Sequence, residues 1–193
     1  MALRIEPDMD SRRLLLATVD HLIKENRIDE AVPLWNRLNT SGGNRQLSPT
    51  SGASLTNGRF DASEGRGFDW RHGDNPGIDL RAGGPGDLRI EFSGHQPESV
   101  SLLEQYVPVM PDKSYRLSFA YRTAGMTGVT GLYWQVLQVT APLNPVPEGV
   151  GTLAFRTGPG LGLVRIALMY ARMPGTMRLE GVVTLRSAEL EVL

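Results

Sequence analysis

Apolar residues in the first forty positions recur at the spacing of an α-helix, in two stretches separated by residues 25–27. Asp10 or Ser11 is suited to cap the first helix, and Asp29 is suited to cap the second. Because the connection is so short, residues 1–39 are predicted to form an antiparallel helical hairpin. The apolar positions are Leu15, Val19, Leu22 and Ile23 in the first helix and Ala31, Leu34, Trp35 and Leu38 in the second.

The hydrophobic period changes to two after a stretch rich in Ser, Thr, Gly and Asn, and residues 40–54 are interpreted as a linker. Alternation of apolar and polar residues is typical of strands with one buried face. Gly and Pro turns separate these strands, and no long amphipathic helix interrupts them. Residues 55–193 are therefore predicted to form an all-β sandwich, which makes the chain mainly β. Strands are expected at residues 88–92, 103–109, 115–121, 132–139, 164–170 and 179–193.

The composition excludes several classes of protein. The 193 residues carry 20 Lys and Arg against 21 Asp and Glu, whereas a nucleic-acid-binding protein usually has a basic excess. Cysteine is absent, which excludes disulfides, thiolate metal sites and a cysteine nucleophile. No apolar run approaches the ~20 residues of a membrane span, and no signal peptide is recognisable. The chain is interpreted as a cytoplasmic protein or as a piece of a longer one.

No catalytic motif in the sequence is complete. The segment Gly52-Ala53-Ser54-Leu55-Thr56 lacks the last glycine of a G-x-S-x-G elbow, and Gly158-Pro159-Gly160 does not continue with dinucleotide-loop spacing. His72 and Asp74 are suited to bind a metal, but no helix or strand fixes a third ligand, so a solvated loop is the alternative. The sequence therefore predicts no enzyme, no catalytic residue and no metal site.

Several motifs between residues 55 and 193 carry a family resemblance. Asn57-Gly58-Arg59-Phe60 and Gly67-Phe68-Asp69-Trp70 come first, then residues 88–90, 104–109 and 114–122, and residues 180–190 close the series. In order and spacing they resemble carbohydrate-binding modules of families four and nine, which share the galactose-binding-like jelly roll. The resemblance implies a jelly-roll β-sandwich and a carbohydrate ligand.

The same resemblance raises the question of a structural calcium ion, which such modules often hold through acidic residues near both ends. The matching positions here read Phe60-Asp61-Ala62 and Arg186-Ser187-Ala188-Glu189. Calcium takes six to eight oxygen ligands, and this acidic pairing is thin. No cofactor is therefore expected.

The helical region carries a second resemblance. Residues 26–35 look like the middle of a tetratricopeptide repeat, and residues 2–8 look like the closing turn of a preceding repeat. A single repeat cannot bury its apolar face alone, so this resemblance implies the end of a repeat array. The alternative is an ordinary helix pair that caps the sandwich.

A sugar site is expected on the face of the strand at 115–121 that is opposite to Tyr115, Leu117, Phe119 and Tyr121. Arginine donors and small residues on that face suit hydroxyl recognition, and an aromatic ring from another strand would cover the apolar face of a sugar. The alternative is a sheet face whose arginines form ion pairs with neighbouring strands, or one that the N-terminal hairpin covers. Tyr133 and Trp134 are adjacent, so one faces inward and the other outward, and the sequence does not decide which. Trp70 is a candidate for the site or for the core. The candidate ligand-binding residues are Arg116, Arg122, Tyr133, Trp134, Gln135 and Trp70.

The expected function follows from the resemblance and from the lack of a catalytic motif. It is that of a non-catalytic carbohydrate-binding-like module of a larger bacterial protein, linked to envelope polysaccharide and therefore extracytoplasmic or envelope-associated. The alternative is a structural or protein-interaction domain of a scaffold, because a fold does not fix a function. The partner is accordingly a glycan or a protein, with no nucleic acid, and the sequence does not determine the oligomeric state.

Overall fold

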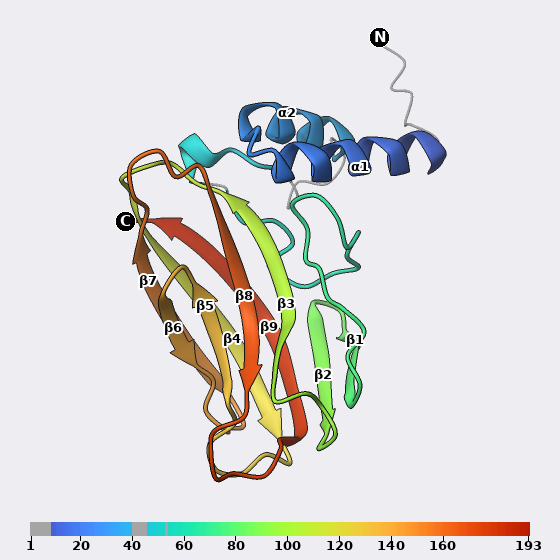
Figure 1. The fold of residues 1–193 in the computed structure, drawn as a ribbon, viewed down its shortest axis with the longest axis vertical. Helices are drawn as coiled ribbons and strands as arrows, with labels where there is room; N and C mark the ends of the chain where they lie inside the picture. The colour runs from blue at the N-terminus through green and yellow to red at the C-terminus, as the bar shows by residue number, and fades with distance from the viewer. Residues whose placement is uncertain (1–8, 40–45, 53) are drawn as a thin grey trace.

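The computed structural model describes residues 9–39, 46–52 and 54–193, and they form a β-sandwich with two helices across one end (Figure 1). Helix α1 is Met9–Lys24 and helix α2 is Ile28–Leu38, followed by a short 3-10 turn, η2, at Pro49–Ser51. The strands are β1 (Ile78–Gly84), β2 (Asp87–Ser93), β3 (Ser99–Pro108), β4 (Ser114–Ala124), β5 (Leu132–Val136), β6 (Val139–Pro142), β7 (Gly149–Arg156), β8 (Leu163–Ala171) and β9 (Glu180–Val192).

The strands form two antiparallel sheets that pack face to face. One sheet has five strands in the order β1-β2-β9-β4-β7, and the other has four in the order β3-β8-β5-β6. In Figure 1 the four-stranded sheet lies toward the viewer and the five-stranded sheet lies behind it. The predicted fold class, a mainly β jelly-roll sandwich preceded by a helical hairpin, is confirmed.

The strand predicted at 132–139 is two strands. Val136 pairs with Val139, so Leu137 and Gln138 form a two-residue hairpin between β5 and β6. Such hairpins need positive φ in the turn, and Leu137 has a φ of 53°. Strands β1 and β7 were not expected from the sequence.

The alternation along β4 and β5 builds the core of the sandwich. Tyr115, Leu117, Phe119 and Tyr121 of β4 are buried, as are Leu132, Trp134 and Val136 of β5. Trp134 has no exposed surface, and its ring centroid lies 5.9 Å from that of Phe119 across the two sheets and 5.8 Å from that of Trp70. The inner face of β5 is therefore the one that carries Trp134, which settles the choice that the sequence left open.

The helical hairpin has a small core of its own beneath it. Trp35 is fully buried, as the sequence predicted, and its ring meets Phe68 of the loop before β1 edge to face at 6.0 Å. Helix α2 begins at Ile28 after Arg27, so Asp29 lies in the first turn and the prediction that it is the N-cap was wrong. The hairpin is thus joined to the sandwich by a shared apolar cluster.

The predicted linker at 40–54 makes contact with the hairpin where it is described. Leu47 is buried, its backbone N–H donates to Asn36 Oδ1 at 2.8 Å, and its carbonyl accepts from Asn36 Nδ2 at 2.8 Å. The division of the chain at 39 and 55 stays a prediction, and so does the tetratricopeptide-like repeat. The repeat turn expected at residues 2–8 lies outside the described residues.

Candidate functional site

The loop from residue 54 to residue 72 is organised around two buried polar side chains. Asp69 has no exposed surface, and its carboxylate accepts hydrogen bonds from Asn57 Nδ2 at 2.9 Å, from the Glu64 N–H at 2.9 Å and from the Trp70 N–H at 2.8 Å. Buried polar groups are costly unless they are paired, so this network fixes the loop in one conformation. The Asp of the Gly67-Phe68-Asp69-Trp70 motif is therefore the centre of the loop.

Asn57, of the Asn57-Gly58-Arg59-Phe60 motif, is the second buried side chain of this hydrogen-bond network. Its side chain bonds the N–H of Asp61 at 2.9 Å and the carbonyl of Asp61 at 3.1 Å, and its own carbonyl accepts from the Trp70 indole N–H at 2.9 Å. The backbone of the next residue, Gly58, packs closely on β9. A Cβ atom at position 58 would lie 2.2 Å from the Ala188 carbonyl oxygen. A side chain is excluded at this position, which explains the glycine.

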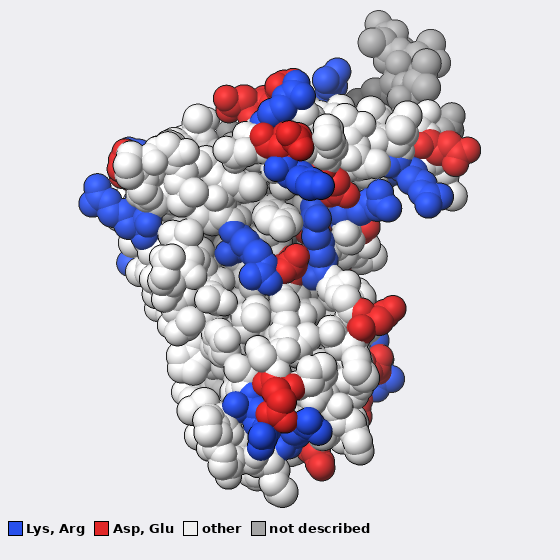
Figure 2. All heavy atoms as spheres, viewed as in Figure 1, with Lys and Arg blue, Asp and Glu red and all other residues white. Residues whose placement is uncertain are grey.

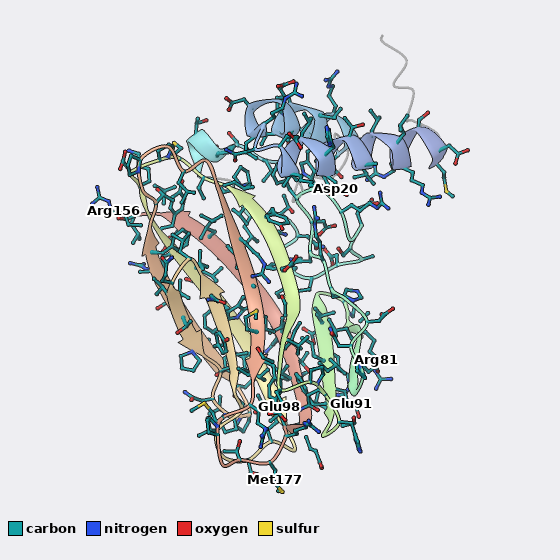
Figure 3. The ribbon with its side chains drawn as sticks, in the orientation of Figure 1. Asp20, Arg81, Glu91, Glu98, Arg156 and Met177 are labelled. Carbon is teal, nitrogen blue, oxygen red and sulfur yellow. The ribbon has the colours of Figure 1, made fainter. Side chains whose placement is uncertain are left out.

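Helix α1 braces the same loop. The Asp20 carboxylate accepts from the Gly67 N–H at 2.8 Å and from the Arg71 guanidinium at 2.6 Å, and Arg12 pairs with Glu64 at 2.6 Å. Figure 3 shows Asp20 on the side of α1 that faces the loop. These ion pairs are only partly exposed, so they are screened less than ordinary surface pairs.

A pocket of about 260 Å³ opens between this loop and the β1–β2 hairpin, and we name it the Trp70 pocket. Its wall combines apolar side chains, two of them aromatic, with polar side chains. The apolar residues are Phe60, Ala62, Trp70, Leu80, Ala82, Leu88 and Leu103, and the polar ones are Asp61, Ser63, His72 and Arg81.

The chemistry of the Trp70 pocket suits a small ligand with both apolar and hydroxylated faces. Phe60 and Trp70 belong to the wall and offer apolar contact through the small exposed parts of these residues, 6% and 2%. His72 and Ser63 bring polar atoms to the same wall. Arg81 is held by Glu91 at 3.0 Å and by Asp79 at 3.5 Å, and Figure 3 shows Arg81 and Glu91 at the β1–β2 edge.

The predicted arginines lie elsewhere. Arg116 and Arg122 point outward from β4, on the outer face of the five-stranded sheet, where Arg116 pairs with Glu191 at 2.9 Å and Arg122 pairs with Asp87 at 3.3 Å. The geometry therefore supports the alternative prediction, that the arginines on the outer face of this strand form ion pairs.

The predicted aromatic residues and glutamine do not join those arginines. Tyr133 and Gln135 are half-buried on the outer face of the four-stranded sheet, on the opposite side of the sandwich from Arg122. Trp134 is fully buried between the sheets and cannot present its ring to a ligand. Of the predicted set, Trp70 alone lines the Trp70 pocket. The expectation that one face would unite these residues was wrong, because β4 and β5 belong to different sheets.

Figure 2 shows the face formed by β3, β8, β5 and β6. Charged side chains gather toward the helices and at the far end of the sandwich, and the middle of the face carries few of them. Tyr133 and Gln135 belong to this sparsely charged sheet face, and neither lines the Trp70 pocket.

The sequence reasoning missed Phe60, Leu80 and His72 as parts of one site. The available signal was the pair of motifs at 57–60 and 67–70, which supply two sides of the Trp70 pocket. Within residues 9–39, 46–52 and 54–193, no three His, Asp or Glu side chains gather as a metal site would require. Over the same residues, neither helix has the length and hydropathy to cross a membrane.

No protein-family model matches the sequence, and no curated protein sequence matches it. Solved structures do match. A carbohydrate-binding module of family four aligns over 72% of this chain and 100% of that module, with 13% identity and a TM-score of 0.52. The fold of this chain is therefore similar to the fold of that module. The jelly roll that the sequence motifs implied is confirmed, and at this identity the match shows the fold alone.

Two further matches are weaker. A family 29 carbohydrate-binding module complexed with cellulohexaose aligns over 62% of this chain and 79% of that chain, with 15% identity and a TM-score of 0.34. An enzymatically active domain of tailspike protein 4 from bacteriophage CBA120 aligns over 80% of this chain and 23% of that chain, with 12% identity and a TM-score of 0.48.

Proposed function

We propose that the sandwich is a non-catalytic carbohydrate-binding module whose ligand enters the Trp70 pocket. The observation that carries the proposal is the composition of that pocket, which combines aromatic and aliphatic residues with the polar residues His72, Ser63 and Asp61. A sugar ring has apolar C–H faces and a polar perimeter, so it needs this combination. The braced loop adds to the proposal, because a rigid wall loses little entropy when a ligand binds.

The size of the pocket is consistent with one sugar unit. Sites for drug-sized ligands range over about 300–1,000 Å³, and the Trp70 pocket, at about 260 Å³, lies just below that range. The module would therefore hold a glycan through a single unit inserted beside the β1–β2 hairpin.

The test begins with an array of oligosaccharides from glucan, xylan, mannan, galactan, chitin, pectin and alginate, probed with the full chain. Each series that gives a signal is then titrated by calorimetry. Ala82, an exposed residue of β1 in the pocket wall, is replaced to fill the pocket. Ala82→Phe is expected to weaken binding at least tenfold, which is about 1.4 kcal/mol.

The matched control is Ala154→Phe, which adds the same ring at an exposed position on β7, away from the Trp70 pocket. It is expected to leave the dissociation constant within about twofold, well below the tenfold step of 1.4 kcal/mol. A folded protein that binds no series, or that binds one equally well with Ala82→Phe, contradicts the proposed site. New reducing ends after prolonged incubation would contradict the non-catalytic role.

A structural or protein-interaction domain is the second candidate. It is favoured by the outer face of the five-stranded sheet, where Arg116, Arg122 and Arg186 are paired with carboxylates and where Val150 is 87% exposed. A face of paired charges with an exposed apolar side chain is better suited to a protein than to a sugar ring. A protein partner whose binding is abolished by Val150→Asp, with silence on the array, would reverse the ranking. The envelope setting stays a prediction.

A further inference from the structure

A second hollow, of about 290 Å³, lies directly beside the Trp70 pocket, and we name it the His72 hollow. His72 belongs to the wall of both. The other residues of the His72 hollow are polar or small: Arg71, Gly73, Ser101 and Glu104.

The two hollows are adjacent because a β-bridge joins residue 71 to residue 104. The N–H of Arg71 donates to the Glu104 carbonyl and the N–H of Glu104 donates to the Arg71 carbonyl, both at 2.8 Å, so residue 71 lies against the edge of β3. Side chains alternate along a strand. Leu103 accordingly lines the Trp70 pocket, whereas Glu104 lines the His72 hollow.

The charged side chains of the His72 hollow are already engaged. Arg71 pairs with Asp20 at 2.6 Å and its guanidinium lies 4.9 Å from the centroid of the Tyr106 ring. Glu104 pairs with Arg165 at 2.6 Å. Neither side chain would have to be desolvated as an unpaired charge when a neutral ligand binds.

The Trp70 pocket has the same charge balance. Arg81 pairs with Glu91 at 3.0 Å and with Asp79 at 3.5 Å. A carboxylate or sulfate on the ligand would find Arg71 and Arg81 already paired with protein carboxylates, so it would gain little attraction from either arginine and would meet repulsion from their carboxylate partners. Hydroxyl groups can donate to carboxylates and accept from guanidinium groups without such repulsion.

We infer that the ligand is a neutral oligosaccharide of at least two units, with one unit in the Trp70 pocket and the next over His72 and Gly73 in the His72 hollow. This inference rests on the proposed function and extends it from a single-unit site to two adjoining subsites. The first subsite supplies apolar contact, and the second supplies hydrogen bonds.

Gly73 provides the variant that separates the subsites. A Cβ at this position would meet only the Asn75 side-chain nitrogen, at 3.8 Å, and Gly73 has no left-handed φ, so a larger residue is accommodated. Because Gly73 lines the His72 hollow and not the Trp70 pocket, Gly73→Phe is expected to fill the hollow alone. Ala82→Phe fills the Trp70 pocket, and Ala154→Phe is the control outside both.

The experiment titrates the wild type and the three variants with fragments of one to four units from every array series that binds, including oligogalacturonate and oligoalginate as the acidic probes. The expected result is that two units of a neutral series bind at least tenfold tighter than one. Gly73→Phe removes that gain and leaves the affinity for one unit unchanged, whereas Ala82→Phe weakens both.

Three results would overturn the inference while the proposed function stands. They are equal affinity for one and two units, equal weakening of both by Gly73→Phe, and tighter binding of an acidic series than of any neutral one. If no series binds the folded protein, the proposed function itself fails, and the inference falls with it.

Discussion

The loop edge of the sandwich and the outer face of its five-stranded sheet use polar residues in different ways. At the loop edge, Asn57 and Asp69 are buried and bond the backbone, while His72 faces the two hollows. On the sheet face, Arg116 and Arg122 are exposed and each bonds a carboxylate.

Strand register explains the ion pairs on the outer face of the five-stranded sheet. Arg116 lies directly opposite Glu191 of β9, so its partner is set by strand pairing and its guanidinium is engaged. The loop has no ladder to satisfy its backbone, so buried side chains do so instead. The comparison teaches that strand pairing can place each charged side chain of a sheet next to its partner. In the loop, buried side chains bond the backbone instead, and other side chains line a site.

The largest expected effect comes from removing the centre of the loop. Asp69→Ala removes the acceptor of the Glu64 and Trp70 N–H groups and one of the two acceptors of the Asn57 amide. Each buried donor without a partner costs about 1–3 kcal/mol, so we expect a loss of about 3–4 kcal/mol in the free energy of unfolding. Urea denaturation measures it.

The matched variant is Asp74→Ala, which removes an exposed carboxylate a few residues further on. It is expected to change stability by no more than about 0.5 kcal/mol. Similar losses for Asp69→Ala and Asp74→Ala would show that the loop is not organised from within, and the comparison with the sheet face would collapse.

The next effect tests how closely the hairpin packs on the loop. A Cβ at Gly67 would lie 2.5 Å from Cζ3 of the buried Trp35 ring, and Gly67 has a φ of 60°. Gly67→Ala combines backbone strain with overpacking, so we expect a loss of about 2–3 kcal/mol. Thermal and urea unfolding both report it.

Gly65 separates strain from overpacking in that result. Its φ is 66°, but a Cβ there would meet nothing within 4 Å. Gly65→Ala is expected to cost only the strain, about 1 kcal/mol. An equal loss of stability in the two alanine variants would mean that the Trp35 side chain moves aside without a free-energy cost. The hairpin would then not brace the loop.

A smaller effect is expected on the sheet face. Arg122→Ala removes an exposed ion pair with Asp87, and such pairs contribute about 0–1 kcal/mol. We expect a loss below about 0.5 kcal/mol that vanishes in 1 M salt, because salt screens exposed charges. Glycan affinity is expected to stay unchanged. A large loss of affinity would restore the β4 face as the site.

The smallest effect concerns pH at the far end of the sandwich, where Figure 3 places Glu98. A hydrogen bond from Arg172, and another from Arg178, holds the pKa of Glu98 below its ordinary value of 4.5. A lowered folded-state pKa contributes stability above pH 4.5 that is lost as pH falls through the folded pKa.

Glu98→Gln is therefore expected to make the acid side of the stability curve slightly shallower and to leave the loop edge unaffected. Urea midpoints between pH 3 and pH 7 provide the measurement. A variant curve parallel to that of the wild type over the whole range would show that protonation of Glu98 does not change the stability. These surface charges would then contribute even less to stability than we expect.

The local elements could be predicted from the sequence because their signals are local. The period of two along residues 115–121 is sufficient to place Tyr115 and Leu117 inside and Arg116 outside. The period of 3.6 and the short connection are sufficient for the hairpin of α1 and α2. The two motifs at 57–60 and 67–70 also mark the loop whose hydrogen bonds they make.

The tertiary structure decided which surfaces meet. Strand β9 lies between β2 and β4, and β5 pairs with β8 and β6, so Arg122 and Tyr133 are on opposite faces of the sandwich. The Trp70 pocket likewise needs β1 and β2 to come up against a loop from earlier in the chain. Periodicity assigns each side chain to a face of its own strand, but strand pairing depends on burying surfaces far apart in sequence, and no local pattern encodes that choice.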